Sequence, residues 1–320
     1  MRKKTYLLFA GWLIAAAACA AADSTLLNLV MPGAKVVSGV HVEKTKASAF
    51  GKYVLARMQS DDQNLNNFAA MTGFDPRRDL SEVVMASTSS GDESSYLVVG
   101  RGTFDRARIV GLARNAGQPV STYHGVDLIQ HKDPEKINAV AFLDGGIAVM
   151  GDLESVQAAI DRRQSGAVAS RALLDRVSRA SAGNDAWFFT VGNPGQFLHG
   201  KLSDPNLNGA LQGDMLQNVQ EAAGGLRFGD LDVKLTAEVV ARTEKDAAAL
   251  ADVVRFFAGM VQLNRDRGPG ASQAATLLDS MQLSAQDNVM KLSLAIPEDQ
   301  LENFFTQRPH KVATRFHAQH

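Results

Sequence analysis

Pairs of strand-like segments joined by short turns are the feature that most constrains the fold of this chain. Residues 139–143 and 147–150 are apolar and flank Asp144-Gly145-Gly146, which favours a tight hairpin turn. Hairpins place consecutive strands antiparallel, so the pattern predicts antiparallel sheets. The other predicted strands are 34–42, 82–87, 95–100, 120–124, 126–131, 186–191, 225–228, 231–240, 281–285 and 289–296.

Segments with apolar residues at helical spacing separate these strands. The longest is 243–263, where Thr243 and Asp246 stand at the spacing of a capping pair and an unbroken apolar stripe runs from Ala247 to Val261. A helix at 297–305 would have Pro297 at its first position, which helices favour. The other predicted helices are 43–58, 62–71, 104–116, 153–163, 170–180, 194–201, 207–222 and 273–280.

The order of elements repeats along the chain. Each half runs strand, helical segment, hairpin, long helix, hairpin, helix, with a boundary at Gln164-Ser165-Gly166. We predict an α+β fold of two topologically similar halves, each an antiparallel sheet covered by helices. A diverged internal duplication explains this order. The alternative is that the repeat is accidental, since the elements of any α+β chain of this length can be grouped into a similar order. The predicted divisions are a signal peptide at 1–22, a first half at 23–165, a second half at 166–305 and a basic tail at 306–320 that contains histidines.

The first 22 residues have the layout of a secretory signal peptide. Arg2-Lys3-Lys4 is followed by an apolar run over 6–18 and by Cys19-Ala20-Ala21-Ala22. Small residues at 20 and 22 predict cleavage before Asp23 and export to the periplasm or the cell exterior. Two alternatives are lipidation of Cys19, which would anchor the protein to a membrane, and an uncleaved anchor, for which the apolar run is short.

Composition narrows the class of protein. Hydrophobic residues make up 45% and charged residues 21%, as in an ordinary globular protein. Loss of Arg2-Lys3-Lys4 would lower the formal net charge from −1 to −4, which argues against nucleic-acid binding. Cys19 is the single cysteine. The cleaved chain therefore has no disulfide, zinc–cysteine site or cysteine nucleophile, and its stability must come from core burial.

Three segments resemble a known group of proteins. They are 73–80 (GFDPRRDL), 141–151 (AFLDGGIAVMG) and the helix that begins with Thr243-Glu244-Lys245-Asp246-Ala247. With them the chain resembles uncharacterised exported bacterial proteins, a domain-of-unknown-function family built from two similar halves. The resemblance implies the fold and the export, and it supplies no activity or site residue.

The histidines are the first candidates for metal binding or acid–base chemistry. His124 and His131, with Asp127 or Asp133, could bind a metal, but we interpret them as strand histidines. His41 and His199 are isolated, and we interpret both as structural. The tail could hold a metal weakly or respond to mild acid, although a solvated tail is the simpler interpretation. Its relevant side chains are His310, Lys311, Arg315, His317 and His320.

Other residue types give no stronger signal. Asp75 and Asp79 are interpreted as a turn residue and as the partner of Arg77 or Arg78. Ser89, Ser90, Ser94 and Ser95 resemble a hydrophilic hairpin tip rather than nucleophiles. The chain has no phosphate-binding Gly-rich loop, His-Glu-x-x-His, Gly-x-Ser-x-Gly or EF-hand pattern. No catalytic, cofactor-binding or metal-ligating residue and no cofactor is therefore predicted.

Aromatic pairs offer the only hint of binding. Trp187-Phe188-Phe189, Phe256-Phe257 and Phe304-Phe305 most simply build the cores. On a helix, however, only one ring of Phe256-Phe257 can face the core well, so the other would lie in an interface or a groove. A concave apolar sheet face that holds a lipid chain is the sharper alternative.

Three functions remain open from the sequence. The first is an exported, non-enzymatic protein that acts by binding or interaction, its partner being a protein or an apolar small molecule. The second is a periplasmic carrier of an apolar ligand in the cleft between the halves. The third is a hydrolase without a motif, which predicts a pocket where His124 or His131 meets an acid within hydrogen-bonding reach.

Overall fold

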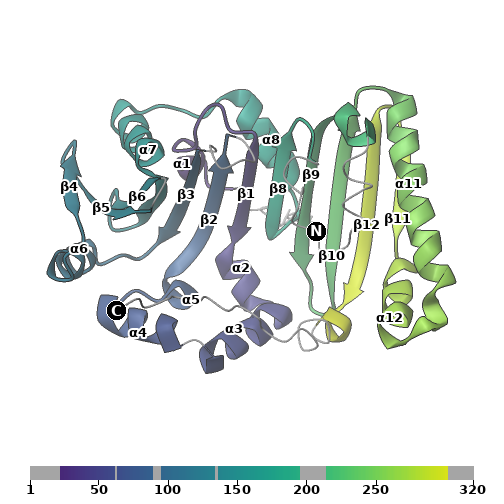
Figure 1. The fold of residues 1–320 in the computed structure, drawn as a ribbon, viewed down its shortest axis with the longest axis horizontal. Helices are drawn as coiled ribbons and strands as arrows, with labels where there is room; N and C mark the ends of the chain where they lie inside the picture. The colour runs from purple at the N-terminus through teal and green to yellow at the C-terminus, as the bar shows by residue number, and fades with distance from the viewer. Residues whose placement is uncertain (1–21, 62, 89–94, 134–135, 195–213, 302–320) are drawn as a thin grey trace, which may run out of the picture.

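The structure is a computed structural model that describes residues 22–61, 63–88, 95–133, 136–194 and 214–301. Its strands form one twelve-stranded sheet in which every neighbouring pair is antiparallel (Figure 1). The strand order is β11-β12-β10-β9-β8-β1-β2-β3-β7-β6-β5-β4. The strands are β1 Val36–His41, β2 Leu80–Ser87, β3 Tyr96–Gly102, β4 Val120–Tyr123, β5 Val126–Lys132, β6 Ile137–Phe142, β7 Ile147–Asp152, β8 Ala186–Val191, β9 Val219–Phe228, β10 Asp232–Ala241, β11 Gln282–Gln286 and β12 Val289–Pro297.

Helices cover both faces of this sheet (Figure 1). Several begin where the sequence places a capping residue: the side chains of Ser170 and Thr243 accept hydrogen bonds from the first turns of α8 and α11. The helices are α1 Ser24–Leu27, α2 Val42–Ala47, α3 Ala49–Asp61, α4 Gln63–Thr72, α5 Pro76–Asp79, α6 Arg106–Asn115, α7 Leu153–Ser165, α8 Arg171–Ser181, α11 Glu244–Leu263 and α12 Pro269–Leu278, with 3-10 turns η1 Asp214–Asn218 and η2 Arg265–Arg267.

The α+β class and the two similar halves are confirmed. From the centre outward the first half runs β1-β2-β3-β7-β6 and the second runs β8-β9-β10-β12-β11. In both, a helix (α6 or α11) lies in the chain between the third strand and the final hairpin, and the first half adds the hairpin β4–β5. The two halves share one continuous sheet, because β1 of the first half pairs with β8 of the second, from Val36↔Thr190 to Val40↔Ala186.

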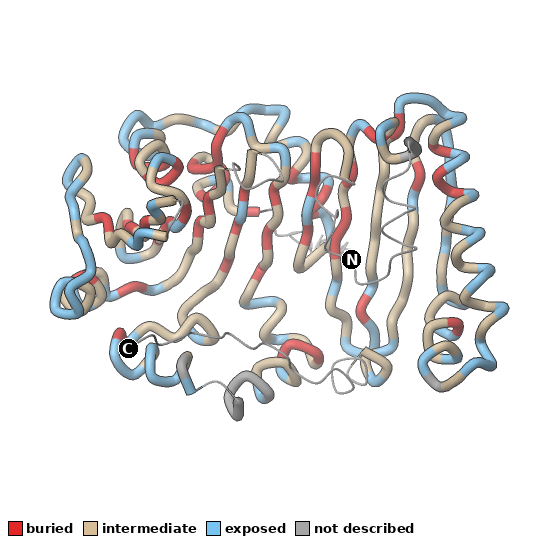
Figure 2. The backbone as a smooth tube through the Cα atoms, in the orientation of Figure 1, coloured by how far each residue is buried: buried red, intermediate tan, exposed pale blue. Residues whose placement is uncertain are grey.

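Cross-strand partners share a face, so the registers define two faces of the sheet. On one face, here called the α7 face, Val37, Ala86, Leu97, Val149 and Phe189 pack against α1, α7 and α8. Figure 2 shows this burial as red segments in the first-half strands and in α7. The opposite face, here called the α6 face, is covered by α4, α6 and α11.

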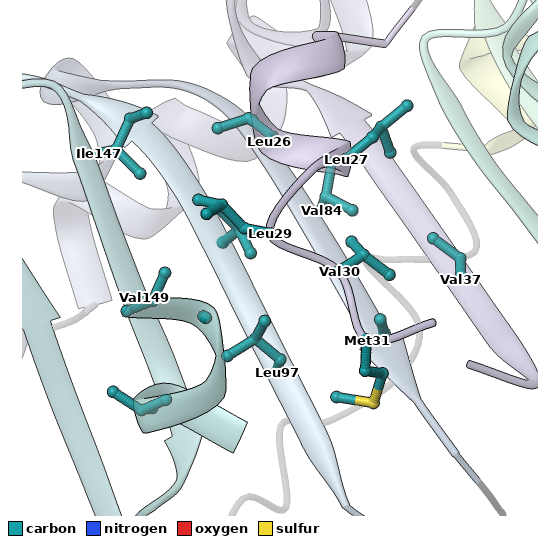
Figure 3. Packing of buried hydrophobic residues seen from close by; sticks show 14 of the residues in the cluster. Leu26, Leu27, Leu29, Val30, Met31, Val37, Val84, Leu97, Ile147 and Val149 are labelled. Atoms are coloured by element: carbon teal, nitrogen blue, oxygen red, sulfur yellow. The ribbon is translucent and has the colours of Figure 1, made fainter. Parts of the chain in front are cut away.

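The segment 22–31 is part of the core. Leu26, Leu27, Leu29 and Val30 are almost fully buried, and they lie over β1, β2 and β3 (Figure 3). Arg162 of α7 holds the segment in place, since its guanidinium donates two hydrogen bonds to the Leu29 carbonyl at 3.1 and 2.7 Å. Sequence periodicity did not predict this element because it is shorter than two helical turns.

Several predicted elements need correction. The helix at 207–222 is wrong where it is described: 214–218 is a 3-10 turn, and β9 starts at Val219 because its alternating side chains pair with β8 and β10. The helix at 43–58 is broken at Ser48, whose hydroxyl caps the next turn through Gly51 N. Pro297 ends β12 rather than starting a helix, and the helical turn begins at 298.

Some predictions fall on residues that the structure does not describe. These are the leader to residue 21, the helix over 195–201, the tail 306–320 and the side chains Ser89, Ser90, Ser94, His199, Phe304 and Phe305. The division of the chain into domains at 166 and 306 likewise stays a prediction.

Candidate functional site

An apolar pocket of about 500 Å³ lies on the α6 face of the first half. Its floor comes from β2, β3, β5, β6 and β7, and its walls come from α4 and α6. Its volume falls in the range of small-molecule sites, roughly 300–1,000 Å³. The pocket therefore lies within the first half and not in the cleft between the halves, where the sequence analysis put the apolar ligand.

Four aromatic rings form one side of this pocket. Phe68 and Phe74 meet edge to face at 6.4 Å between ring centroids, Phe74 and Phe104 lie 5.1 Å apart, and Phe104 and Phe142 lie 5.4 Å apart. The series runs from α4 through the two connecting loops to β6. Such ring pairs stabilise one another beyond their area burial, so this wall is preorganised.

Among the described residues that line it, the pocket presents no free polar side chain. Thr72 carries the one side-chain hydroxyl in its lining, and that hydroxyl lies 2.7 Å from the Phe68 carbonyl and accepts from Phe74 N at 3.1 Å. The remaining lining side chains are aliphatic, aromatic or methionine, apart from Gly100. A ligand of this pocket would be held by apolar burial, and no acid, base or nucleophile of the lining faces it.

Polar contacts outside the pocket hold its two helices together. The Arg108 guanidinium of α6 donates to the carbonyls of Ala70 and Met71 at 3.0 Å each, so it caps the end of α4. Gly73 then takes a positive φ of 75°, which glycine adopts without steric cost at the end of a helix. These contacts fix the end of α4 beside α6 at the mouth of the pocket.

The turn after α4 is held by two ion pairs, of which the sequence predicted the one made by Asp79 and gave Asp75 as a turn residue. Asp75 caps α5 and accepts from Arg77 Nε and NH2 at 2.8 Å each, and Asp79 accepts from Arg78 Nε at 2.6 Å. The hydrogen bonds from Arg77 and Arg78 lower the pKa of Asp75 and of Asp79, respectively, below the usual aspartate value. Both aspartates thus have structural partners.

Apolar side chains are also exposed around the pocket. Met71 of α4 is 62% exposed, and Met85, Met150 and Phe188 are each more than 40% exposed. The last three lie in one row of the α6 face, since Phe188 pairs with Ser38, Ser38 with Met85, Met85 with Val98, and Val98 with Met150. This row extends the apolar surface from the pocket to the junction of the halves.

A second groove, of about 700 Å³, lies on the α7 face of the second half, between α8 and β8–β12, and is here called the polar groove because charged side chains line it among apolar ones. Its charges are already paired: Arg176 with Glu221 at 2.6 Å, Arg179 with Glu221 at 3.5 Å and Lys291 with Glu238 at 3.3 Å. The Lys291–Glu238 pair is exposed on both sides and contributes little stability, whereas Glu221 is partly buried. Within the part of the chain that the structure describes, no histidine, cysteine or aspartate lines the groove.

The histidine candidates do not converge. His124 sits in the β4–β5 turn and contacts Asp161 at 3.5 Å, whereas His131 lies at the far end of β5 and contacts Asp133 at 3.2 Å. Both histidine side chains are more than half exposed, and neither lines either pocket. Asp127 binds Arg106 and Arg114 instead. Within the described residues no group of three histidine, cysteine or acidic side chains could hold a metal.

The adjacent aromatic residues on β8 and on α11 are partly buried and partly exposed, because neighbouring side chains of a strand or helix point in different directions. Trp187 and Phe189 are buried on the α7 face and Phe188 is exposed on the other. On α11 the ring of Phe256 is 63% exposed while Phe257 is half-buried, so one ring of this pair does lie away from the core. His41, the predicted structural histidine, is buried beside Glu82 at 3.8 Å.

Comparison with solved structures finds the same fold in TP0453. Crystal forms III and I of TP0453 match with TM-scores of 0.52 and 0.50, at 11% and 12% sequence identity. The matches cover 88% and 89% of this chain and 98% of the TP0453 chain. At such identity the likeness shows the fold alone. No family model and no curated protein sequence matches this chain, so the resemblance to an uncharacterised exported family stays a prediction.

Among the helices that the structure describes, none is long and apolar enough to cross a membrane.

Proposed function

We propose that this chain is an exported, non-enzymatic protein that binds an apolar molecule or chain in the pocket between α4, α6 and the sheet. The observation that carries the proposal is the chemistry of the lining: four aromatic rings, aliphatic side chains and one hydroxyl that is already bonded. An apolar ligand gains about 0.8 kcal/mol for each methylene group that it buries there. A polar ligand would lose its hydration without compensation.

The exposed row beside the pocket fits the same role. A ligand longer than the pocket would continue over Met150, Met85 and Phe188, whose side chains are flexible or flat and adapt to an apolar surface. Export is part of the proposal and follows from the leader pattern. It places the protein where an apolar molecule must cross or stay in an aqueous compartment.

A protein partner is the second candidate role, and α11 carries the observation that favours it. Phe256, Met260 and Leu263 are exposed at spacings of four and three residues, so they lie on one stripe of the helix. An amphipathic helix or groove of a partner could cover this stripe. Because it lies on α11 and not at the pocket, the two roles can be tested separately.

The test is titration of the mature protein with N-phenyl-1-naphthylamine, an uncharged apolar fluorophore. Ala113 lines the pocket from α6, and Ala113→Leu would occupy the space of about two ligand methylene groups. At ~0.8 kcal/mol each, the variant should weaken binding by about tenfold or more. The matched control is Ala248→Leu, an equal change at an exposed position of α11.

Saturable binding that Ala113→Leu weakens and Ala248→Leu leaves unchanged supports the proposal. Equal affinities for all three proteins would place the probe elsewhere, and no saturable binding by the parent protein would remove the pocket as a ligand site. Loss of probe binding in a Leu263→Ser variant alone would favour the α11 stripe.

A further inference from the structure

Glu82 is a buried carboxylate with few partners. It lies on β2 and is 9% exposed. Within the described chain its one hydrogen-bond donor is the backbone nitrogen of Asp23, at 3.1 Å from Oε1. His41 Nδ1 lies 3.8 Å from the same oxygen. A buried carboxylate that receives one neutral amide hydrogen bond is poorly compensated for the loss of its hydration.

The electrostatic surroundings of Glu82 also show that its negative charge is poorly compensated. Burial raises the pKa of Glu82 above the usual glutamate value, although the Asp23 hydrogen bond and His41 act against it. The nearby carboxylate of Asp23 forms an ion pair with Arg101 of β3, with 2.5 Å between Asp23 Oδ2 and Arg101 Nε. Two carboxylates thus face a single guanidinium, with His41 of β1 as the remaining titratable group.

Asp23 itself makes several hydrogen bonds and an ion pair that hold the N-terminal segment in place. Its side chain caps α1 by accepting from Thr25 N at 2.8 Å, besides binding Arg101. The segment that follows is anchored by Arg162, as described above, and by the Asn28 side chain, which accepts from Ala169 N at 2.9 Å. The leader pattern independently predicts Asp23 as the first residue of the mature chain.

We propose that cleavage before Asp23 creates an α-ammonium group that forms a buried ion pair with Glu82. A leader-removing peptidase hydrolyses the bond between Ala22 and Asp23 with one water molecule. The new carboxylate leaves on Ala22, and the amine that stays on Asp23 takes up a proton. The ammonium group supplies the second positive charge beside the Asp23 and Glu82 carboxylates. Ala22 is buried in the uncleaved chain, so the bond is cut before the chain folds.

The ion pair has a predicted pH dependence. Pairing with Glu82 raises the pKa of the α-amine in the folded protein above its unfolded value of about 7.7–8.0. The stabilisation is therefore fully present below about pH 7.7 and is lost as the pH rises through the higher folded pKa. Glu82, Arg101, His41 and the Asp23 carboxylate are the groups that set this shift.

The experiment uses protein purified from the exported fraction, as the parent and as Glu82→Gln. Glu43→Gln is the control, because Glu43 is an exposed carboxylate that pairs with Lys46. Intact mass spectrometry gives the first residue. Acylation by an amine-reactive succinimidyl ester at pH 7, followed by peptide mapping, then gives the rate at the α-amine of native and urea-unfolded protein.

The proposal expects a mature mass that starts at Asp23 and an α-amine that reacts at least about tenfold more slowly in the native than in the unfolded protein, since one pKa unit changes the free-amine fraction tenfold. Glu43→Gln should keep this protection and Glu82→Gln should lose it. If Glu82→Gln does not fold, the stability of the parent between pH 7 and 9 decides, because the paired amine requires a loss in this range.

Three results would overturn the proposal. A lipid-modified mass that begins at Cys19 would leave Asp23 N as an amide, and so would any other start upstream of Asp23. An α-amine that labels equally fast in the native and unfolded parent would show that it is unpaired. Equal protection in Glu82→Gln and Glu43→Gln would show that Glu82 is not its partner.

Discussion

The two halves share a strand order but use their faces differently. On the α7 face of the first half, Leu97 of β3 and Val149 of β7 are fully buried. At the corresponding strands of the second half, Glu238 of β10 and Lys291 of β12 face the polar groove. The same topology thus supports an apolar core in one half and a polar surface in the other, because strand order does not fix which face is apolar.

The α6 face shows the opposite contrast. In the second half, α11 lies close to the sheet through Ala247 and Ala251, both with no exposed surface. In the first half, α6 buries only Val110 fully, and its Ile109 and Leu112 border the pocket. Small residues on α11 fit directly against the sheet, whereas between α6 and the sheet there is a pocket with an aromatic wall. The comparison explains why the pocket lies in the first half.

Core truncations should give the largest effect and should separate the halves. Leu97→Ala removes a fully buried side chain of the first-half core, and we expect a loss of about 3 kcal/mol in the free energy of unfolding. Leu283→Ala in β11 removes a half-buried side chain and should cost about 1 kcal/mol. Urea unfolding measures both, and equal losses would contradict the assignment of the main core to the first half.

Enlarging one alanine on each helix tests the difference between α6 and α11. Ala251→Leu overpacks a full contact, so it should destabilise the protein by about 2 kcal/mol. Ala113→Leu enters open space in the pocket and should change stability by less than about 0.5 kcal/mol. Thermal unfolding of the two variants measures this, and a large loss in Ala113→Leu would mean that the pocket closes in solution.

Removing the cap of α5 should have a smaller, pH-dependent effect. Asp75→Ala loses the cap and the Arg77 ion pair, and we expect a cost of about 1 kcal/mol at pH 7. The pKa of Asp75 is lowered in the folded protein. The electrostatic part of its contribution to the free energy of unfolding is therefore present above about pH 4 and is lost as the pH falls through the folded pKa. A difference between variant and parent that stays constant from pH 7 to pH 3 would contradict this.

Breaking a pair in the polar groove should have the smallest effect. The side chains of Lys291 and Glu238 are both more than one-third exposed, so Lys291→Met should change the free energy of unfolding by less than about 0.5 kcal/mol. A loss above about 1 kcal/mol in chemical denaturation would show that the groove is part of a core rather than a surface.

Local patterns predicted much of the fold. The strand at 186–191 matches β8 residue for residue, and the predicted capping pair forms, since Thr243 Oγ1 accepts from Asp246 N at 3.2 Å. The helix predicted over 207–222 failed at β9, where Ala222, Ala223 and Gly224 favour no strand by themselves. Their conformation comes from pairing with β8 and β10, and such tertiary pairing cannot be inferred from local periodicity.

The candidate site was harder to predict than the fold. The sequence predicts an apolar ligand between the halves, and its adjacent aromatic residues lie on β8 and α11. Nothing in the sequence marks Phe68, Phe74, Phe104 and Phe142 as a group, because they come from segments up to 74 positions apart and meet only in the folded chain. The Asp23–Glu82 contact spans 59 positions and was missed for the same reason.

Native mass spectrometry of the protein purified from the exported fraction of its own host shows whether the pocket holds a ligand. We expect a folded chain that retains an apolar molecule of defined mass, which is released on denaturation and is retained less by Ala113→Leu than by Ala248→Leu. A parent chain whose native and denatured masses are equal, and which also fails to bind the apolar fluorophore, would contradict the claim that the pocket between α4, α6 and the sheet is a ligand site.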